Sequence, residues 1–520
     1  MNKKPKELSA VKNESNKEKI RTGIKLCTLN DTQRIETDVV LPDYCKEIKK
    51  LLKCIFIPGV HTVSLSGEKA TSKGTGVLRI IYLGEGDVLD AFEKSIDLSS
   101  SVQIKDAPSD AVITANQKVD FINCRVTGQR KLSVSFAVTT VFDCHTVRNV
   151  EFVSSVEEKS VHTKKDKVTG EEICSFTEKT FDMSETVELK SEHPAAEKIV
   201  SCDGVCSLES KKFSSGKLLI KGEVRAEICY IPEKTENRLH KLVHTMPISQ
   251  IVDTGEEKEE CMHNVRLEIG QLSCNLKSDS SGAGRLIELS ARVSTFVTAY
   301  MKKELEVITD CYCTECETET SYKEAEFNCP VREIKETLQH KGEIEFSSPV
   351  KEIVSLRCLE TGVNVSCDEN KTRGDCSALF GIIYLDENGV PGYCEKNLDF
   401  EFSYVIAKKC KEPYAEFLIC VNSASASLSS SEKAEIQLDY TVCGKILCRY
   451  EKKILKELAL LKDKPIKDKG VALTLYFAEK DESLWDIARH HNTTVELIMR
   501  ENGIKNEKET REGMLLIPCI

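Results

Sequence analysis

The sequence of 520 residues contains no uninterrupted apolar run of about 18 residues, the length that a membrane-spanning helix requires. Its first residues also lack the apolar core of a secretory signal peptide, since residues 1–25 carry eight Lys or Arg and three Glu. These absences predict a protein that begins in the cytosol, stays on that side of a membrane and has no transmembrane segment. We expect residues 1–25 to form a flexible N-terminal tail.

An excess of positive charge is also absent. The 73 Lys and Arg residues are outnumbered by 84 Asp and Glu residues, which gives a net charge of −11. This balance does not suggest a nucleic-acid partner, and it argues against an anionic membrane bound through a basic patch. Gly-x-Ser-x-Gly, Walker-loop and His-Glu-x-x-His motifs are missing as well. We therefore expect a protein that is not an enzyme and has no cofactor.

Cysteine, by contrast, is abundant, with 24 residues. In a long cytosolic chain such residues are typically free thiols that pack as small apolar groups. The best metal candidate is the cluster Cys311, Cys313 and Cys316, because Cys-x-x-Cys can supply two thiolates to zinc. No second pair with ordinary zinc spacing completes a tetrahedral site, so structural thiols and no metal are predicted.

Three landmarks recur in the same order at a period near 150 residues, which indicates internal duplication. One is a tyrosine in an apolar run, at Tyr82, Tyr230 and Tyr384, with spacings of 148 and 154 residues. Another is a proline upstream of each tyrosine, and the third is a strongly alternating segment downstream. The prolines are Pro42, Pro194 and Pro349, and the alternating sets are Leu132/Val134/Phe136/Val138, Ile287/Leu289/Ala291/Val293 and Ile436/Leu438/Tyr440/Val442.

Alternation with period two indicates strands that are buried on one face. Turn-forming residues at 280–284, 386–389 and 428–432 support hairpins. The sequence therefore predicts a mainly β multidomain protein with three related β-rich domains and a small C-terminal α+β module. The predicted bounds are 26–160, 161–312 and 313–460 for the domains, 461–471 for a linker and 472–520 for the module.

The C-terminal module is predicted to have the order βααβ. Ser483 can cap a first helix, with Asp486 three residues later, and Leu484, Ile487 and Ala488 give that helix an apolar face. For the second helix we expect Thr493 as the N-cap and Asn502–Gly503 as the stop, since both final residues tolerate a left-handed backbone.

This module resembles a LysM domain. The resemblance rests on three segments: Lys480 to Ala488, Val495 to Asn502, and Gly513 to Pro518. The upstream copies resemble a β-rich repeat of spore-forming Firmicutes over residues 38–460. Together they resemble the SipL-like clostridial spore morphogenetic proteins. That resemblance implies a partner, the coat-basement ATPase stage IV sporulation protein A, and a location in the mother-cell cytoplasm at the forespore outer membrane, where the spore coat assembles.

Two departures bear on the ligand. LysM domains usually place Gly where this chain has Asp481, and a side chain there obstructs close backbone approach to a sugar. Residues 472–520 also hold nine Asp or Glu and only six Lys or Arg. Both features favour protein binding over the N-acetylglucosamine of peptidoglycan. A peptidoglycan-binding protein of the cell wall or spore cortex remains the alternative.

Trp485 is the only tryptophan, and it lies off the apolar face of its helix. Trp is enriched among residues that dominate binding energy, although it can equally shield its own module. If it binds the partner, we expect Trp485→Ala to cost about 2 kcal/mol or more of affinity. The predicted partner-binding surface comprises Lys480, Asp481, Glu482, Ser483, Leu484, Trp485, Ile487 and Gly513. The β domains are expected to self-associate or bind other coat proteins, and coat cross-linking through thiols is compatible with that role.

Overall fold

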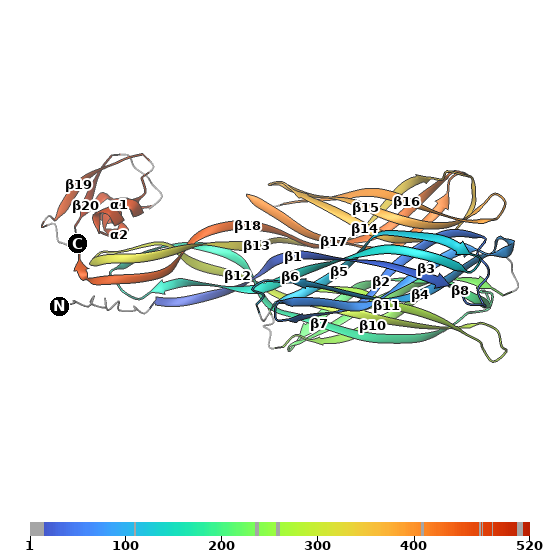
Figure 1. Ribbon diagram of the computed structural model, residues 1–520. Coiled ribbons are helices and arrows are strands. Elements are labelled where there is room, and N and C mark those ends of the chain that lie inside the picture. The colour runs from blue at the N-terminus through green and yellow to red at the C-terminus, as the bar shows by residue number, and fades with distance from the viewer. Residues whose placement is uncertain are drawn as a thin grey trace, which may run out of the picture.

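The structure is a computed structural model that describes residues 15–108, 111–233, 239–255, 260–406, 410–466, 470, 472–480, 482–506 and 513–519. Almost all of the described chain is β-strand, and two short helices lie near the C-terminus (Figure 1). The predicted fold class, a mainly β protein with a small βααβ module, is confirmed. None of the helices among the described residues is long and apolar enough to cross a membrane.

The strands form three units of six, which we number in chain order. Unit 1 contains β1 (Ser15–Val40), β2 (Lys50–Ser66), β3 (Lys69–Leu83), β4 (Leu89–Gln103), β5 (Val112–Gly128) and β6 (Lys131–Val156), with a 3-10 turn, η1 (Glu85–Asp87). Unit 2 contains β7 (Val161–Glu188), β8 (Ala196–Ser214), β9 (Lys217–Pro232), β10 (His240–Asp253), β11 (Met262–Lys277) and β12 (Leu286–Cys313). Unit 3 contains β13 (Cys316–Glu345), β14 (Val350–Cys367), β15 (Lys371–Asp386), β16 (Pro391–Val405), β17 (Glu412–Leu428) and β18 (Lys433–Pro465).

Each unit is built from two antiparallel three-stranded sheets with the same strand order. One sheet joins the first, last and fifth strands, and the other joins the second, third and fourth, as in β1-β6-β5 and β2-β3-β4. The predicted alternating segments are the central strands β6, β12 and β18, and their apolar residues are at most 3% exposed. Alternation therefore marked one of the two central strands of each core, because a central strand packs one whole face against the opposing sheet.

The three predicted turns are also present. Residues 278–285 connect β11 to β12, and residues 387–390 connect β15 to β16. Gly282 and Gly389 have φ values of +84° and +77° in these turns, a left-handed backbone that glycine adopts without strain. Residues 429–432 connect β17 to β18 in the same way.

The first and last strands of every unit extend beyond the sheets into a shared stem, which consists of the paired strand ends of β1–β6, β7–β12 and β13–β18 (Figure 1). Each unit contributes three buried side chains to its core: Ile20, Val150 and Phe152; Val168, Leu305 and Val307; Ala325, Phe327 and Ile454. The Tyr450 hydroxyl adds a polar link between units 3 and 2, since it donates to the Thr169 carbonyl at 2.5 Å and accepts from the Thr169 amide at 2.7 Å.

The stem corrects two sequence predictions. A flexible tail over residues 1–25 is wrong for residues 15–25, which belong to β1 and pair with β6, with Ile20 fully buried. Residues 461–465 belong to β18 and not to a linker. Both segments are ordered by pairing with the other long strand of their own unit, and Ile20 of the first is also buried among the other units in the stem. Residues 1–14, 467–469 and 471 lie outside the described part of the chain.

Candidate functional site

The C-terminal module consists of β19 (Leu473–Ala478), α1 (Leu484–His491), α2 (Val495–Asn502) and β20 (Gly513–Pro518). Ser483 is the N-cap of α1 as predicted, since its hydroxyl accepts from the Asp486 amide at 3.1 Å. Gly503 ends α2 with φ of +64°, also as predicted. The Asn502 side chain fixes α2 to β20, because it accepts from the Leu516 amide and donates to the Leu516 carbonyl, both at 2.7 Å.

The N-cap of α2 differs from the prediction by one residue. Thr494 caps this helix by accepting from the Leu497 amide at 3.1 Å, whereas Thr493 is fully buried. The prediction of Thr493 was wrong because two adjacent threonines can both serve as caps and the sequence does not distinguish them. The Thr493 carbonyl instead accepts a hydrogen bond of 2.8 Å from the Tyr312 hydroxyl, far away in the chain.

Trp485 lies in a buried contact between the module and the stem, with only 6% of its surface exposed. Its indole Nε1 donates to Asp310 Oδ2 at 2.8 Å, and its ring meets Tyr312 edge-to-face with centroids 5.0 Å apart. Trp485 thus belongs to the core of its own module and also contacts the stem. Its position off the helix's own apolar face directs it to a second apolar surface, provided by β12.

Asp310 is the centre of this contact. Arg489 Nη1 lies 2.9 Å and 3.2 Å from its two carboxylate oxygens, and the Tyr322 hydroxyl donates to Oδ1 at 3.1 Å. A carboxylate that accepts from several groups in a partly buried site is strongly anchored. We name Asp310 and Tyr312 of the stem, with Trp485, Arg489 and Thr493 of the module, the latch.

The module contacts the stem end of unit 2, although units 1 and 3 have equivalent stem ends. Val153, Ile308 and Leu455 occupy one cluster in the stem and mark equivalent positions on β6, β12 and β18. Two and four residues farther along, unit 2 has Asp310 and Tyr312. Unit 1 has Ser155 and Glu157 there, and unit 3 has Glu457 and Ala459. Only β12 therefore combines an acceptor for the indole with an aromatic ring.

The structure divides the predicted partner-binding residues into two groups. Lys480 is exposed, and Glu482 and Ser483 are half-buried with local hydrogen bonds. The Glu482 carboxylate accepts from the Tyr476 hydroxyl at 2.7 Å and so raises the pKa of that tyrosine. Leu484 and Ile487 are buried in the core of the module, together with Trp485. Gly513 opens β20 opposite Ala478, and Asp481 lies outside the described residues.

A further surface was missed from the sequence. The outer face of the β19–β20 sheet presents five large apolar side chains: Leu473, Leu475, Phe477, Met514 and Leu516. Leu475 lies opposite Leu516, and Phe477 lies opposite Met514. Leu475, Phe477 and Met514 are 65–70% exposed, which is unusual for neighbouring residues of this type. The alternation from Leu473 to Phe477 is the signal that could have revealed it. We name these five residues the outer face.

The cysteine cluster does not assemble a metal site. The Cys313 and Cys316 sulfurs lie 3.7 Å apart, whereas the Cys311 sulfur lies beside the Tyr322 hydroxyl at 3.9 Å. Among the described residues, no group of three or more His, Cys, Asp or Glu side chains is arranged to hold a metal ion. Cys410 and Cys448 form a disulfide, so the prediction of free thiols is wrong for these two, while the other 22 cysteines, all described, are outside any disulfide.

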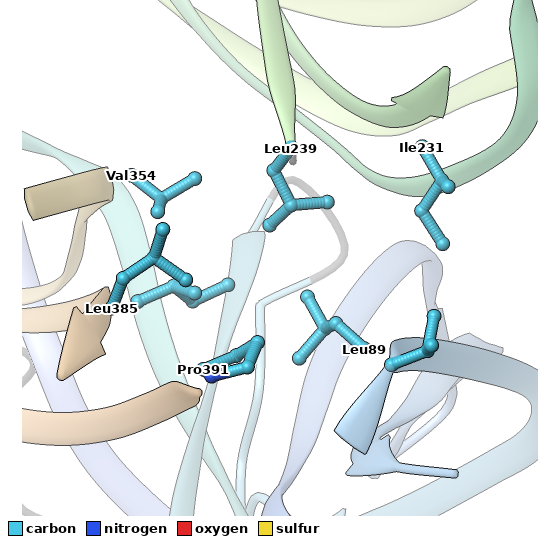
Figure 2. Close-up of a pocket in the computed structure, with 8 residues that line it drawn as sticks. Leu89, Ile231, Leu239, Val354, Leu385 and Pro391 are labelled. Atoms are coloured by element: carbon cyan, nitrogen blue, oxygen red, sulfur yellow. The ribbon is translucent and has the colours of Figure 1, made fainter. Parts of the chain in front are cut away.

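The three units also meet at the end of the molecule opposite the stem. Asp203 of unit 2 pairs there with Arg79 of unit 1 at 2.8 Å and with Arg357 of unit 3 at 2.9 Å. A small apolar pocket of about 10 Å³ lies between the hairpins of the three units, lined by Val88, Leu89, Ile231, Leu239, Val354, Ile383, Leu385 and Pro391 (Figure 2). Its volume admits roughly one water molecule, so it is a packing defect at a junction and not a ligand site.

Comparison with known families supports the domain content of the chain. Residues 195–277, which span β8 to β11, match the family described as "SipL, SPOCS domain", and residues 479–516 match the LysM domain. The same four-strand arrangement recurs as β2–β5 and β14–β17 in units 1 and 3. Comparison with curated proteins and with solved structures gives no match. The chain thus carries a SipL SPOCS domain and a C-terminal LysM domain, which supports a sporulation-related protein with a LysM module.

Proposed function

We propose that this chain is a non-enzymatic scaffold of spore-coat assembly whose LysM module docks onto a coat-basement ATPase of the stage IV sporulation protein A type. The SipL SPOCS and LysM matches support a role in sporulation. The mother-cell cytoplasm, at the forespore outer membrane, is the location that this role requires. The three β units would act as a rigid support and offer surfaces for self-association or for other coat proteins.

The outer face is the observation that carries protein docking. Exposed, contiguous apolar side chains mark interaction sites, since they gain free energy when another apolar surface removes them from water. Phe477 supplies an aromatic anchor at the end of this face, opposite Met514, and aromatic residues are enriched at energetically dominant contacts. The acidic balance of the module adds to the preference for a protein over a glycan.

The predicted site residues have two roles in this proposal: some border the outer face, and others support it from inside the module. Lys480, Glu482 and Ser483 form a polar rim, because they follow the end of β19 at Ala478, and Gly513 begins β20 next to Met514 of the outer face. Leu484 and Ile487 support the sheet from its inner side. Trp485 joins the partner surface only when the module leaves the stem, because the latch covers it.

A two-ligand retention assay tests the proposal. The full chain is mixed with the purified ATPase in one arm and with insoluble peptidoglycan in the other. We expect retention by the ATPase and none by the glycan. Retention by peptidoglycan that N-acetylglucosamine oligomers displace, without retention by the ATPase, would establish the alternative of a wall or cortex protein.

A further inference from the structure

Two pairs of cysteines occupy equivalent positions in units 1 and 2. Cys54 on β2 lies opposite Ile80, and Cys202 on β8 lies opposite Ile228. These two isoleucines each precede the landmark tyrosine of their unit by two residues. The repeat therefore places Cys54 and Cys202 at the same site in the fold.

Their partners are equivalent as well. Cys124 on β5 lies opposite Val134, and Cys274 on β11 lies opposite Leu289, which are matching positions of the central strands. Cys54 and Cys124 pack in the same apolar core of unit 1, and Cys202 and Cys274 pack in the corresponding core of unit 2. Each pair thus places two cysteine side chains in one cluster from strands of different sheets, at the edge where β2 lies against β5 and β8 against β11.

Unit 3 lacks both cysteines at this site. Leu356, opposite Ile382, and Ala424, opposite Leu438, take the two positions and lie in the core of that unit. A leucine and an alanine therefore fill the site by apolar packing alone. The two positions therefore change together: both are cysteine in units 1 and 2, and neither is cysteine in unit 3. Packing of small apolar groups alone does not require this joint change, whereas a bond between the two sulfurs does.

We propose that Cys54–Cys124 and Cys202–Cys274 are oxidation sites at which a hydroperoxide forms one disulfide in each unit and thereby staples its two sheets together. The inference stands apart from the docking proposal, because it rests on the β units and involves no residue of the LysM module. Unit 3 contains a disulfide elsewhere, between Cys410 and Cys448, and has no counterpart of these sites.

The chemistry is balanced with hydrogen peroxide as the oxidant. The thiolate of the more exposed cysteine attacks one peroxide oxygen, the O–O bond breaks, and a sulfenic acid and a first water form. The sulfur of the buried partner then attacks the sulfenic sulfur, the S–S bond forms, and a second water leaves. Two thiols lose two electrons in total, and one peroxide is reduced to two waters.

In unit 1, the burial of Cys54 and Cys124 indicates which thiol attacks the peroxide and which one closes the disulfide. Cys54 is only 5% exposed, whereas Cys124 is half-buried and accessible to a small oxidant. The Cys54 thiol nearby lowers the pKa of Cys124, and the same interaction together with burial raises the pKa of Cys54. Cys124 is therefore the thiol that ionises first and reacts with the peroxide.

The test uses the full reduced chain, treated with hydrogen peroxide under native conditions and mapped by mass spectrometry of non-reduced peptides. We expect both links, within single chains, and a rise of several degrees in the thermal midpoint that dithiothreitol reverses. Recovery of Cys54 or Cys202 without its link in folded, oxidised protein overturns the oxidation sites. Links that leave the thermal midpoint unchanged overturn the stapling role.

Unit 3 supplies the design of the control variants. Cys54→Leu with Cys124→Ala, and Cys202→Leu with Cys274→Ala, install the pair that unit 3 already accommodates. Each double variant should lose its own link and keep the other. If either double variant does not fold, the single change Cys124→Ser, at a half-buried position, removes the same link with less disturbance to the core. A variant without one cysteine of a pair cannot form that disulfide. If peroxide still raises its thermal midpoint by as much as in the unaltered protein, that pair does not contribute to the stabilisation.

Discussion

The LysM module has two apolar surfaces, of which one is buried against the stem and the other is exposed. The surface around Trp485 is covered by the stem and anchored by hydrogen bonds to Asp310 and from Tyr312. The outer face of β19–β20 remains exposed. The difference shows that Trp485, the only tryptophan of the sequence, does not mark the exposed surface of the module. A buried indole requires a hydrogen-bond acceptor, and the stem provides one, whereas the aliphatic residues and Phe477 of the outer face require only another apolar surface.

The largest effect is expected for Trp485→Ala. This change empties the centre of the latch, and truncation of a buried Trp typically costs about 3–5 kcal/mol. We expect the module to separate from the stem while the three β units stay folded. Hydrogen exchange measures this as faster amide exchange at the end of β12 and in α1. Unchanged protection at both places would contradict the buried contact.

Phe477→Asp should act on the other surface. The side chain is 67% exposed, so the free energy of unfolding should change by less than about 0.5 kcal/mol. Binding of the coat ATPase should weaken by more than about 2 kcal/mol, because a charge replaces an aromatic anchor. Titration calorimetry with the full chain measures the affinity.

The matched control for that variant is Val405→Asp. Val405 is an apolar residue of unit 3 with 68% exposure, and it lies outside the module. Its substitution should leave the affinity unchanged. Equal weakening by both changes would show that added negative charge, and not loss of the outer face, is responsible.

Asp310→Ala is expected to weaken the latch by about 2 kcal/mol, since it leaves the Trp485 indole without its acceptor and removes the ion pair with Arg489. Trp485 is the only tryptophan, so its fluorescence reports release directly as a shift of the emission to longer wavelength. Glu457→Ala changes the equivalent stem position of unit 3, which is exposed, and should leave the spectrum as it is.

Tyr312→Phe should give the smallest effect. It keeps the ring that contacts Trp485 and removes the hydrogen bond to the Thr493 carbonyl, which is worth about 1 kcal/mol. The same fluorescence measurement should show a smaller shift, or a normal spectrum that changes at a lower urea concentration than in the unaltered protein. A larger effect than that of Asp310→Ala would make Tyr312, and not Asp310, the main anchor.

Much of the fold could be read from local patterns. Period-two alternation located the central strands β6, β12 and β18, and turn residues located hairpins, because both depend on neighbours in the chain. The site was predicted less well. The N-cap of α2 is Thr494 and not the predicted Thr493, since either threonine can cap a helix. The outer face was not predicted, because alternation along one strand does not tell whether another element covers its apolar face.

What the sequence determined by itself is the repeated β unit, the βααβ module and the N-cap of its first helix, since alternation, turn chemistry and capping act within a few residues. Tertiary structure alone decided that residues 15–25 are ordered, that three units share one stem and that Trp485 is buried. Each of these depends on contacts between segments more than 100 residues apart, such as the 175 residues between Asp310 and Trp485. Such contacts form only when the whole chain has folded, so a pattern within a few neighbouring residues does not predict them.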